Sequence, residues 1–381
     1  DHQVVAIADP RRQRAELAQQ QVNAFYAQRL GAEQFHGCDI YNDFRDVVAR
    51  DDIDAIWGCV PDHWHGVAYS HVITAGKDLY GEKPLTRWID QGRRICDLVR
   101  QYNCVFQTGT QQRSSPHFRQ ACELAIAGYL GRVHTIRVGA PGGTSYPAEP
   151  PCAPPPGFDY DLWTGPAPFL PFDTKRCEWL AMYMISHYCA GFITNWGVHY
   201  LDIAGWGCPE VFDKKFEAEG SGELPADGMT DTWMSWHLEL RWESGLKMDY
   251  SDDDNPNRHG CRFEGDEGWV HVNRDGIWAE PESLLTVQLK PQDTHLHVSP
   301  LHGDPYTAHT ADFFRSIRTR QNPVSPVESG HAASTLGNVS DIALRLGRKV
   351  TWDPQQQTFV DDDLANAMRD RALRSPWNMI G

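Results

Sequence analysis

The sequence predicts an α/β fold: a doubly wound parallel sheet, followed by an α+β domain with a large, mostly antiparallel open sheet. Three observations support this prediction. Apolar runs and helical patterns alternate from residue 3 to residue 108, as they do in parallel α/β sheets. The segment Asp54–Val60 is a continuous apolar run, which is typical of a central strand covered on both faces. Residues 233–242 alternate between apolar and polar side chains, which indicates a strand with one covered face.

The first domain is expected to cover residues 1–112. It begins with a strand, Gln3–Asp9, and continues with a helical pattern, Pro10–Leu30, in which Leu17 and Phe25 fall near a 3.6-residue period. The elements expected next are a short helix Tyr41–Val48, a strand Asp54–Val60, a helix from His65, a strand Lys77–Pro84, a helix Trp88–Tyr102 and a strand Cys104–Thr108. Because β-α-β connections place successive strands in parallel, a doubly wound parallel sheet is the most economical topology.

The second domain is expected to cover residues 113–381 and to serve substrate binding and oligomerisation. Its expected elements are a helix Phe118–Ala127, a strand from Val133, strands Trp233–Trp242, Gly245–Tyr250, Gly260–Glu264 and Gly268–Asn273, and helices Ala308–Arg318 and Ser329–Leu346. We expect the C-terminal helices and tail to pack back on the first domain. An exposed sheet face rich in tryptophan predicts a homo-oligomer, either a dimer or a tetramer.

Composition narrows the classes of partner. The chain has 381 residues and a formal net charge of -16, which argues against a nucleic-acid surface and favours a small-molecule substrate. No apolar run approaches the roughly 20 residues of a membrane span. Ten cysteines lack a metal-ligand spacing, so we expect free thiols, a cytoplasmic location and no metal site. The acidic run Ser251–Asp254 could bind a hard cation, although such runs are more often turns that face water.

Asp9 is a candidate cofactor ligand. An acid at the end of a strand is typical of the second strand of a dinucleotide-binding fold, where its carboxylate hydrogen-bonds the adenosine ribose. Residue 1 stands directly before this strand, so we expect the first strand and its glycine-rich turn to lie upstream of the printed sequence. Asp9 favours NAD because a carboxylate repels a 2′-phosphate, whereas Arg11 and Arg12 leave NADP open.

Glu82 and Lys83 stand side by side where the strand Lys77–Pro84 ends. The residue before a proline is pushed out of the α region, so the Lys83 ammonium should project beyond the strand end, where open α/β sheets bind ligands. A solvated loop pair is the alternative interpretation. His65 follows another strand end in the same way, and either packing at a helix start or a functional role fits its position.

A second group of polar residues lies in Gly191–Ala204. On one helix, Asn195, His199 and Asp202 share a face because they are four and three residues apart. An acceptor at one imidazole nitrogen would fix the tautomer and leave the other nitrogen free for proton transfer. The alternative is a histidine that is satisfied inside a helix bundle. Zinc is disfavoured because no thiolate or second imidazole stands at ligand spacing.

Together these residues resemble the Gfo/Idh/MocA family, dinucleotide-dependent oxidoreductases that act on sugars, inositols and related polyols and contain a Rossmann domain. The resemblance covers essentially the whole chain. Asp9 is similar to the ribose acid, Val60–His65 to the segment after the fourth strand, and Gly81–Pro84 to the E-K-P signature. Asn195 and His199 resemble the D-x-x-x-H helix with one change. Stretches near Gly109, Trp163 and the C-terminus resemble a branch whose enzymes often carry an export signal, so export to the periplasm is the alternative location.

The resemblance implies a role for each residue. Lys83 would hydrogen-bond the hydroxyl at the carbon that loses hydride, and His199 would relay its proton. Glu82 would hold the nicotinamide ribose. The resemblance further assigns the cofactor's surroundings to Val60, Pro61, His65 and either Gln111 or Arg113.

One departure from the family pattern and one compositional feature add to this assignment. Asn195 replaces a carboxylate, so either Asp202 orients His199 or the chemistry has drifted, because an amide stabilises an imidazolium less than an anion does. Aromatic rings commonly stack on sugars, which makes Trp163, Tyr183 and Trp196 candidate substrate contacts, although core residues would look the same.

Three functions follow from this reading. The leading one is an NAD(P)-dependent dehydrogenase or reductase that acts on a secondary alcohol of a sugar, glycoside or polyol. The second is a redox-assisted glycosidase, in which oxidation, elimination and reduction leave no net NADH. The third is a non-catalytic sugar-binding relative, for which Asn195 and the missing glycine-rich turn are the evidence.

Overall fold

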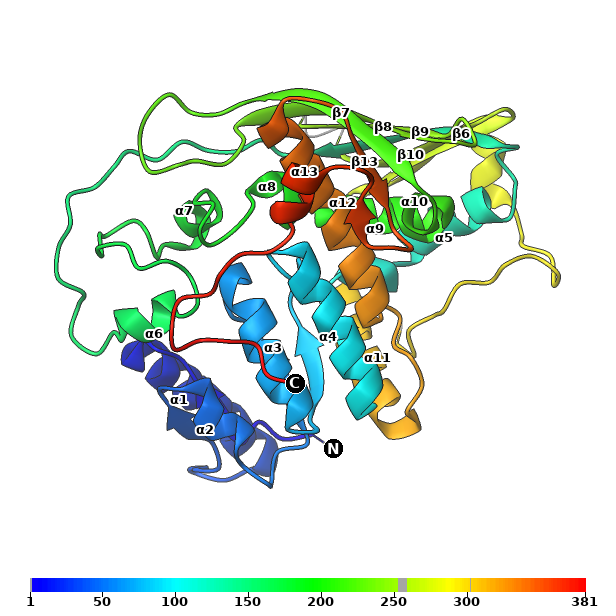
Figure 1. Cartoon of the computed structure of the whole chain (residues 1–381). Helices are drawn as coiled ribbons and strands as arrows, with labels where there is room; N and C mark the ends of the chain where they lie inside the picture. The colour runs from blue at the N-terminus through cyan, green and yellow to red at the C-terminus, as the bar shows by residue number, and fades with distance from the viewer. Residues whose placement is uncertain (1, 253–258, 302) are drawn as a thin grey trace.

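The computed structural model describes residues 2–252, 259–301 and 303–381 and contains an N-terminal α/β layer and a large sheet above it (Figure 1). Asp253 and Asp254 of the acidic run lie outside the described residues. The fold is the predicted one: a Rossmann-type parallel arrangement followed by a large, mostly antiparallel sheet.

The parallel strands of the N-terminal layer are short and belong to two hydrogen-bonded groups. Strand β1 pairs with β2, and β3, β4 and β5 pair in that order. The predicted helix Tyr41–Val48 is wrong in its first half, where Tyr41 ends β2. The helix starts later because the Asp43 carboxylate accepts a hydrogen bond from the Arg45 amide and caps it. The bounds are β1 Ala6–Ala8, β2 Asp39–Tyr41, β3 Ala55–Gly58, β4 Asp78–Gly81 and β5 Phe106–Thr108.

Helices connect these strands. Helix α1 stops at Gly31, whose φ of 65° is left-handed. The apolar period within α1 does not form a buried stripe, because α1 packs on the short strands β1 and β2, and Leu17 and Phe25 are each 56% exposed. The bounds are α1 Arg12–Leu30, α2 Phe44–Val48, η1 Asp62–Trp64, α3 His65–Thr74, α4 Ile89–Tyr102 and η2 Gln111–Ser114.

The large sheet has the strand order β12-β11-β10-β6-β9-β8-β7-β13-β14. Its strands pair antiparallel except β6 and β9, which run parallel. The strand predicted at residues 233–242 is β8, and its side chains alternate between buried and more exposed positions as expected. The bounds are β6 Val133–Ala140, β7 Phe216–Glu223, β8 Ser235–Trp242, β9 Lys247–Asp252, β10 Gly260–Gly265, β11 Gly268–Asn273, β12 Gly276–Glu280, β13 Val350–Asp353 and β14 Thr358–Phe359.

Helices cover one face of this sheet, its inner face (Figure 1), and the opposite, outer face carries charged groups. Trp236 and Trp242 of β8 lie in the core between the sheet and the helices, so these two tryptophans do not contribute to an exposed face of the sheet. On the outer face, Arg137 of β6 bridges Asp249 and Glu264. The remaining helices are α5 Pro116–Ile126, α6 Tyr160–Thr164, α7 Trp179–Tyr183, α8 Phe192–Asn195, α9 Val198–Gly207, α10 Glu210–Asp213, η4 Glu282–Thr286, α11 Pro305–Thr319, α12 Val327–Leu346 and α13 Asp363–Ala367.

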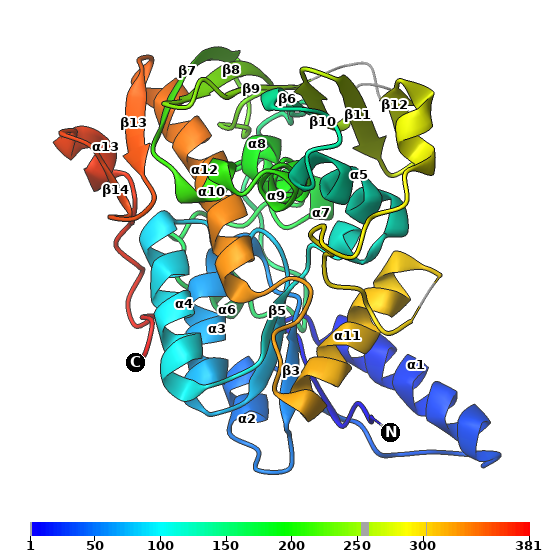
Figure 2. The same cartoon turned by 90° about the vertical axis from the view of Figure 1, so that its right-hand side faces the viewer.

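The C-terminal tail returns to the N-terminal layer (Figure 2). The Trp377 ring lies 4.7 Å from the Trp64 ring, edge to face. The Ile380 amide donates to the Ser70 hydroxyl of α3 at 3.2 Å. In the part of the chain that the structure describes, every helix is too short or too polar to span a bilayer.

Candidate active site

A cavity of about 370 Å³ lies where β1, β3 and β4 end, at the edge of the parallel strands where such folds bind ligands. It collects most of the predicted cofactor residues and two of the predicted aromatic ones. Those that line it are Asp9, Arg11, Val60, Pro61, His65, Glu82, Lys83, Trp163 and Tyr183. The cavity therefore joins the Rossmann layer to helices α6 and α7.

The Lys83 side chain contacts the second domain at Asn195, the last residue of α8. Its Nζ donates to both the main-chain oxygen and the side-chain Oδ1 of Asn195, each at 3.0 Å. Burial lowers the pKa of Lys83 from its ordinary value, and the Asp62 and Glu82 carboxylates partly oppose that shift. A lysine with a lowered pKa can exchange a proton nearer neutral pH than a free one can.

The Asn195 carbonyl is available to Lys83 because the predicted single helix is broken. Asn195 ends α8, His199 lies in α9, and the His199 amide donates to Trp196 rather than to Asn195. The break lies at Gly197, where an added Cβ would collide with the Tyr250 hydroxyl and the Ile193 carbonyl. That hydroxyl donates to the Ile193 carbonyl, so a side chain from β9 occupies the space beside the turn.

Asp62 supplies a carboxylate to this group, and the sequence analysis did not assign it a role. The Asn195 amide nitrogen donates to Asp62 Oδ2 at 3.0 Å and to Oδ1 at 3.3 Å. Asp62 is only 4% exposed. The Asn195 side chain thus links Lys83 on one side to an anion on the other. The signal was present, since Asp62 stands inside the segment Val60–His65 that resembles the family.

His199 lies one turn beyond Asn195 and is buried. Its Nδ1 has no hydrogen-bond partner among the described residues. Burial, followed by the charges of Lys83 and Arg274, lowers the pKa of His199 well below its ordinary value, which favours the neutral ring. No hydrogen bond joins His199 to Lys83 within the described part of the chain.

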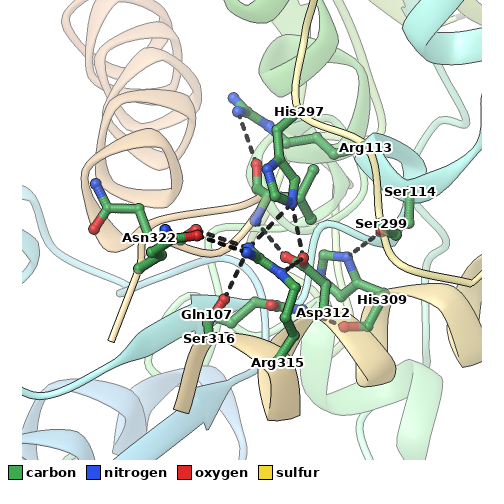
Figure 3. Close-up of polar contacts among 12 residues, drawn as sticks. Gln107, Arg113, Ser114, His297, Ser299, His309, Asp312, Arg315, Ser316 and Asn322 are labelled. Carbon is green, nitrogen blue, oxygen red and sulfur yellow. Dashed lines mark hydrogen bonds and ion pairs between the residues drawn. The ribbon is translucent and has the colours of Figure 1, made fainter. Parts of the chain in front are cut away.

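Asp62 and Lys83 line the cavity, whereas Asn195, His199, Asp202 and Arg113 do not. The Asp202 carboxylate accepts two hydrogen bonds from Arg113, both at 2.7 Å, and both side chains are buried. Asp202 therefore does not orient His199, because both of its carboxylate oxygens accept hydrogen bonds from Arg113 of η2. Arg113 also donates to the Val324 carbonyl, and the Val324 amide donates to the carboxylate of Asp312 in α11. Figure 3 shows Arg113 and Asp312 within one cluster of polar contacts. The Arg113–Asp202 pair holds η2, α9 and α11 together.

Glu82, Gln111 and His65 fix the loops around the cavity. Gln111 donates to Tyr80 Oη at 2.9 Å and to Glu82 Oε1 at 3.4 Å. The His65 nitrogens lie 2.7 Å from the Pro84 carbonyl and 2.9 Å from the Val60 carbonyl. At Gly109 an added Cβ would come within 2.6 Å of the Glu82 carboxylate. His65 therefore ties two strand ends together, and Gly109 leaves room for Glu82.

At the other end of the cavity, the Arg11 amide donates to Asp9 Oδ1 at 2.7 Å. Burial raises the pKa of Asp9, while Arg14 and Arg11 oppose that shift. The Arg11 guanidinium is engaged elsewhere, since it donates to the Cys177 carbonyl and lies 4.3 Å over the Phe158 ring. Arg14, which the sequence analysis did not consider, also lines the cavity.

The aromatic candidates divide into two sets. Trp163 and Tyr183 line the cavity. The Trp163 main-chain carbonyl is hydrogen-bonded to the His63 and Trp64 side chains. Trp196 does not line it, and its ring lies between Arg274, at 5.0 Å, and His199, at 6.0 Å. Its indole nitrogen is buried and unpartnered among the described residues.

All ten cysteines are free thiols, as expected. Within residues 2–252, 259–301 and 303–381, no group of three or more His, Cys, Asp and Glu side chains is arranged to hold a metal ion.

Comparison with known proteins extends this description. Residues 1–110 match the Gfo/Idh/MocA model described as "Oxidoreductase family, NAD-binding Rossmann fold". Residues 146–379 match the model described as "Oxidoreductase family, C-terminal alpha/beta domain".

Individual relatives are more distant. The chain is 30% identical over 112 residues to the uncharacterized oxidoreductase YrbE of Bacillus subtilis, covering 29% of this chain and 31% of that protein. It spans about a third of the length of the first curated relatives it matches. It is 22% identical to myo-inositol 2-dehydrogenase of Thermotoga maritima, over 85% of each chain. The scyllo-inositol dehydrogenase structure of Lactobacillus casei with NAD(H) and scyllo-inositol has a TM-score of 0.57 at 17% identity, covering 94% of this chain and 90% of that one.

Proposed function

Because the chain belongs to the Gfo/Idh/MocA oxidoreductase family, we propose that it transfers hydride between NAD and a secondary alcohol of a sugar, glycoside or polyol. The observation that carries this proposal is the buried Lys83, held by Asn195 at the end of β4 with neutral His199 beside it. Relatives named as inositol dehydrogenases support the substrate class.

The residues present fit an NAD molecule. Asp9 offers a carboxylate at the end of β1 and Glu82 a second one at the end of β4, so each can accept hydrogen bonds from a ribose hydroxyl. Gly109 leaves the space that Glu82 needs, and Gln111 orients its carboxylate. Bound NAD would supply the hydride acceptor. Since the Arg11 guanidinium is already engaged by the Cys177 carbonyl, Arg14 is the residue through which NADP would have to be accommodated.

Lys83 binds and orients the substrate hydroxyl in this proposal. Two of its three Nζ hydrogens point to Asn195 oxygens, which leaves one direction for the hydroxyl. Because burial lowers the pKa of Lys83, more of the amine is neutral near physiological pH and can accept the hydroxyl proton. His199, whose ring is neutral, is the next proton acceptor. Trp163 and Tyr183 would pack against the substrate.

The Asp62–Asn195 pair sets how far the Lys83 pKa falls. A carboxylate in direct contact would favour the ammonium strongly, whereas an anion one amide away opposes burial less. Asn195 therefore does not by itself indicate a non-catalytic protein, because the missing carboxylate has a counterpart in Asp62.

The test is NADH formation by the full-length protein with a panel of inositols, aldoses and glycosides, monitored at 340 nm. We expect turnover with at least one member and detectable NAD binding by calorimetry. Absence of NAD binding would contradict the proposal and favour a sugar-binding relative. Release of aglycone without net NADH would instead identify a redox-assisted glycosidase.

We also propose a homo-oligomer formed through the outer face of the large sheet. Trp278, which is 46% exposed, and Trp269 lie on strands β12 and β11 at one end of that face. Exposed aromatic patches of this kind are commonly buried between subunits. A sedimentation experiment that finds a monomer at micromolar concentration would contradict the proposal.

A further inference from the structure

A second cavity, of about 330 Å³, lies where the start of α4 meets α12 and the segment after α13. Its polar lining includes Arg87, Asn338, Arg345 and Arg371. Among the described residues, it shares no lining residue with the candidate active-site cavity. Its size is within the range of small-molecule sites, about 300–1,000 Å³.

Arg87 is a buried cation without a matching anion. Its side chain belongs to a residue that is 5% exposed, and its Nε donates to the Ser186 carbonyl at 3.2 Å. Among the described residues, this is the guanidinium's only hydrogen bond, and no carboxylate forms an ion pair with it. A guanidinium has five N–H donors, and burial of a charge is costly unless it is paired. Arg87 therefore has donors that an incoming anion could satisfy.

Asn338, on α12, is a second unsatisfied group on the wall of the same cavity. It is 3% exposed, and neither its amide nitrogen nor its oxygen has a partner in the described part of the chain. Buried side-chain amides are normally hydrogen-bonded. Arg87, on the same wall, donates to the Ser186 carbonyl and lies 4.1 Å over the Trp88 ring but has no carboxylate partner among the described residues. The unpaired amide is therefore an independent indication that a polar ligand belongs here.

The other charges of the cavity are largely balanced. Arg345 donates to Asp341 at 2.9 Å, and Asp341 also accepts from Trp233. Arg371 donates to His187 Nδ1 at 2.9 Å. With Arg87, Arg345 and Arg371 against Asp341 and Asp370, the lining keeps one positive charge in excess, although the whole chain carries -16. The excess favours an anion over a neutral ligand.

The rest of the wall is apolar and includes Trp88, Ile89, Ile342 and Met368. A fully hydrated inorganic anion would gain nothing from these side chains, whereas an organic acid could bury its hydrocarbon part against them. We propose that this cavity binds a small organic carboxylate, with Arg87 as its charge partner, Asn338 as its hydrogen-bond partner and the apolar wall around its carbon skeleton.

The proposal is tested by calorimetric titration of the full-length protein with benzoate, acetate and inorganic phosphate in the absence of NAD. Benzoate should bind at least about tenfold more tightly than acetate, because acetate lacks the apolar part. Since the readout is binding without NAD, the outcome is independent of whether the chain is a dehydrogenase. Undetectable benzoate binding, or phosphate binding that is tighter than benzoate binding, would overturn the proposal.

Variants locate the binding in this cavity. Arg87→Met should weaken benzoate binding at least about tenfold, because a charge-assisted hydrogen bond is lost. Asn338→Leu should also weaken it while the ligand-free protein unfolds at an unchanged or higher temperature, since the protein itself does not use that amide. The matched control is Arg348→Gln, which removes a guanidinium that pairs with Asp362 outside the cavity and should leave binding unchanged. Benzoate affinity unaffected by both Arg87→Met and Asn338→Leu would place the ligand elsewhere and refute the assignment.

Discussion

Lys83 and Arg113 are both interior cations that reach across to the segment containing α8 and α9, yet their partners differ. Arg113 meets the Asp202 carboxylate directly through two hydrogen bonds of 2.7 Å. Among the described residues, the Lys83 Nζ donates only to the two oxygens of Asn195, whose amide nitrogen in turn donates to the Asp62 carboxylate. A direct buried ion pair fixes structure and keeps both charges, whereas a buried amine without one can change its protonation state. The first arrangement fits a structural role, and the second fits the proton-accepting role that we propose for Lys83.

The largest effect is expected from Lys83→Ala. It should lower kcat/KM for hydride transfer by on the order of 10⁴-fold, because it removes the proposed proton acceptor. Steady-state NADH formation by the full-length protein measures this loss. Lys349→Ala, which removes an exposed lysine that pairs with Glu217, is the control and should keep normal turnover. Near-normal turnover of Lys83→Ala would contradict a catalytic role for Lys83, which would then be a structural cation like Arg113.

Asp202→Ala should mainly reduce stability. It leaves Arg113 buried without its carboxylate, and breaking a buried pair costs about 3–5 kcal/mol. Urea denaturation should show this loss, while the folded fraction retains most of its kcat. A variant with full stability and greatly reduced kcat would instead place Asp202 in the chemistry.

Asp62→Asn should lower kcat/KM by roughly tenfold, because it exchanges a charge-assisted hydrogen bond to Asn195 for a neutral one. Removing the anion also removes a charge that raises the pKa of Lys83. The rise of kcat/KM with pH in alcohol oxidation should therefore move to lower pH. A pH profile identical to that of the unmodified protein would show that Asp62 does not act on Lys83.

Asn195→Asp should shift the pKa of Lys83 in the opposite direction to Asp62→Asn. A carboxylate in direct contact with Nζ favours the ammonium, so the pKa of Lys83 should rise and the rise of kcat/KM with pH should move to higher pH. Asn195→Asp also places a carboxylate oxygen where the amide nitrogen now donates to Asp62, at 3.0 and 3.3 Å, so the measurement is made on the double variant Asn195→Asp/Asp62→Asn, in which this repulsion is removed. A shift to lower pH would contradict the assignment of Lys83 as the titrating amine.

His199 is tested by a direct titration, because the rise of kcat/KM with pH already reports the protonation state of Lys83. Since burial and the Lys83 charge lower the pKa of His199 well below its ordinary value, its ring should stay neutral at pH values at which a free histidine is protonated. An NMR titration of the His199 ring signals, assigned by their loss in His199→Gln, measures this. A midpoint at or above the ordinary histidine value would contradict a neutral, buried His199.

Local pattern was sufficient to place the residues at the strand ends. The apolar run before Pro61, the proline after Lys83 and the acid after Gln3–Ala8 located Val60, Lys83 and Asp9 at one edge of the sheet, because strand periodicity and proline geometry act over a few residues. Family resemblance added roles for Glu82 and His199. The same local reasoning failed for Asp202, because Asp202 does share α9 with His199 but its carboxylate pairs with Arg113, a residue 89 positions away in the sequence.

The pairing of the charged side chains was decided by the tertiary structure. Tyr250 of β9 occupies the space beside Gly197, breaks the helix and frees the Asn195 carbonyl for Lys83. Asp62 reaches Asn195 across 133 residues of sequence. Arg87 has no carboxylate partner among the described residues, although acidic residues are abundant in the chain. Sequence periodicity sets which face of an element a side chain occupies. The packing of distant elements sets which charge stands opposite it, and that choice determines whether a buried cation holds the fold, moves a proton or awaits a ligand.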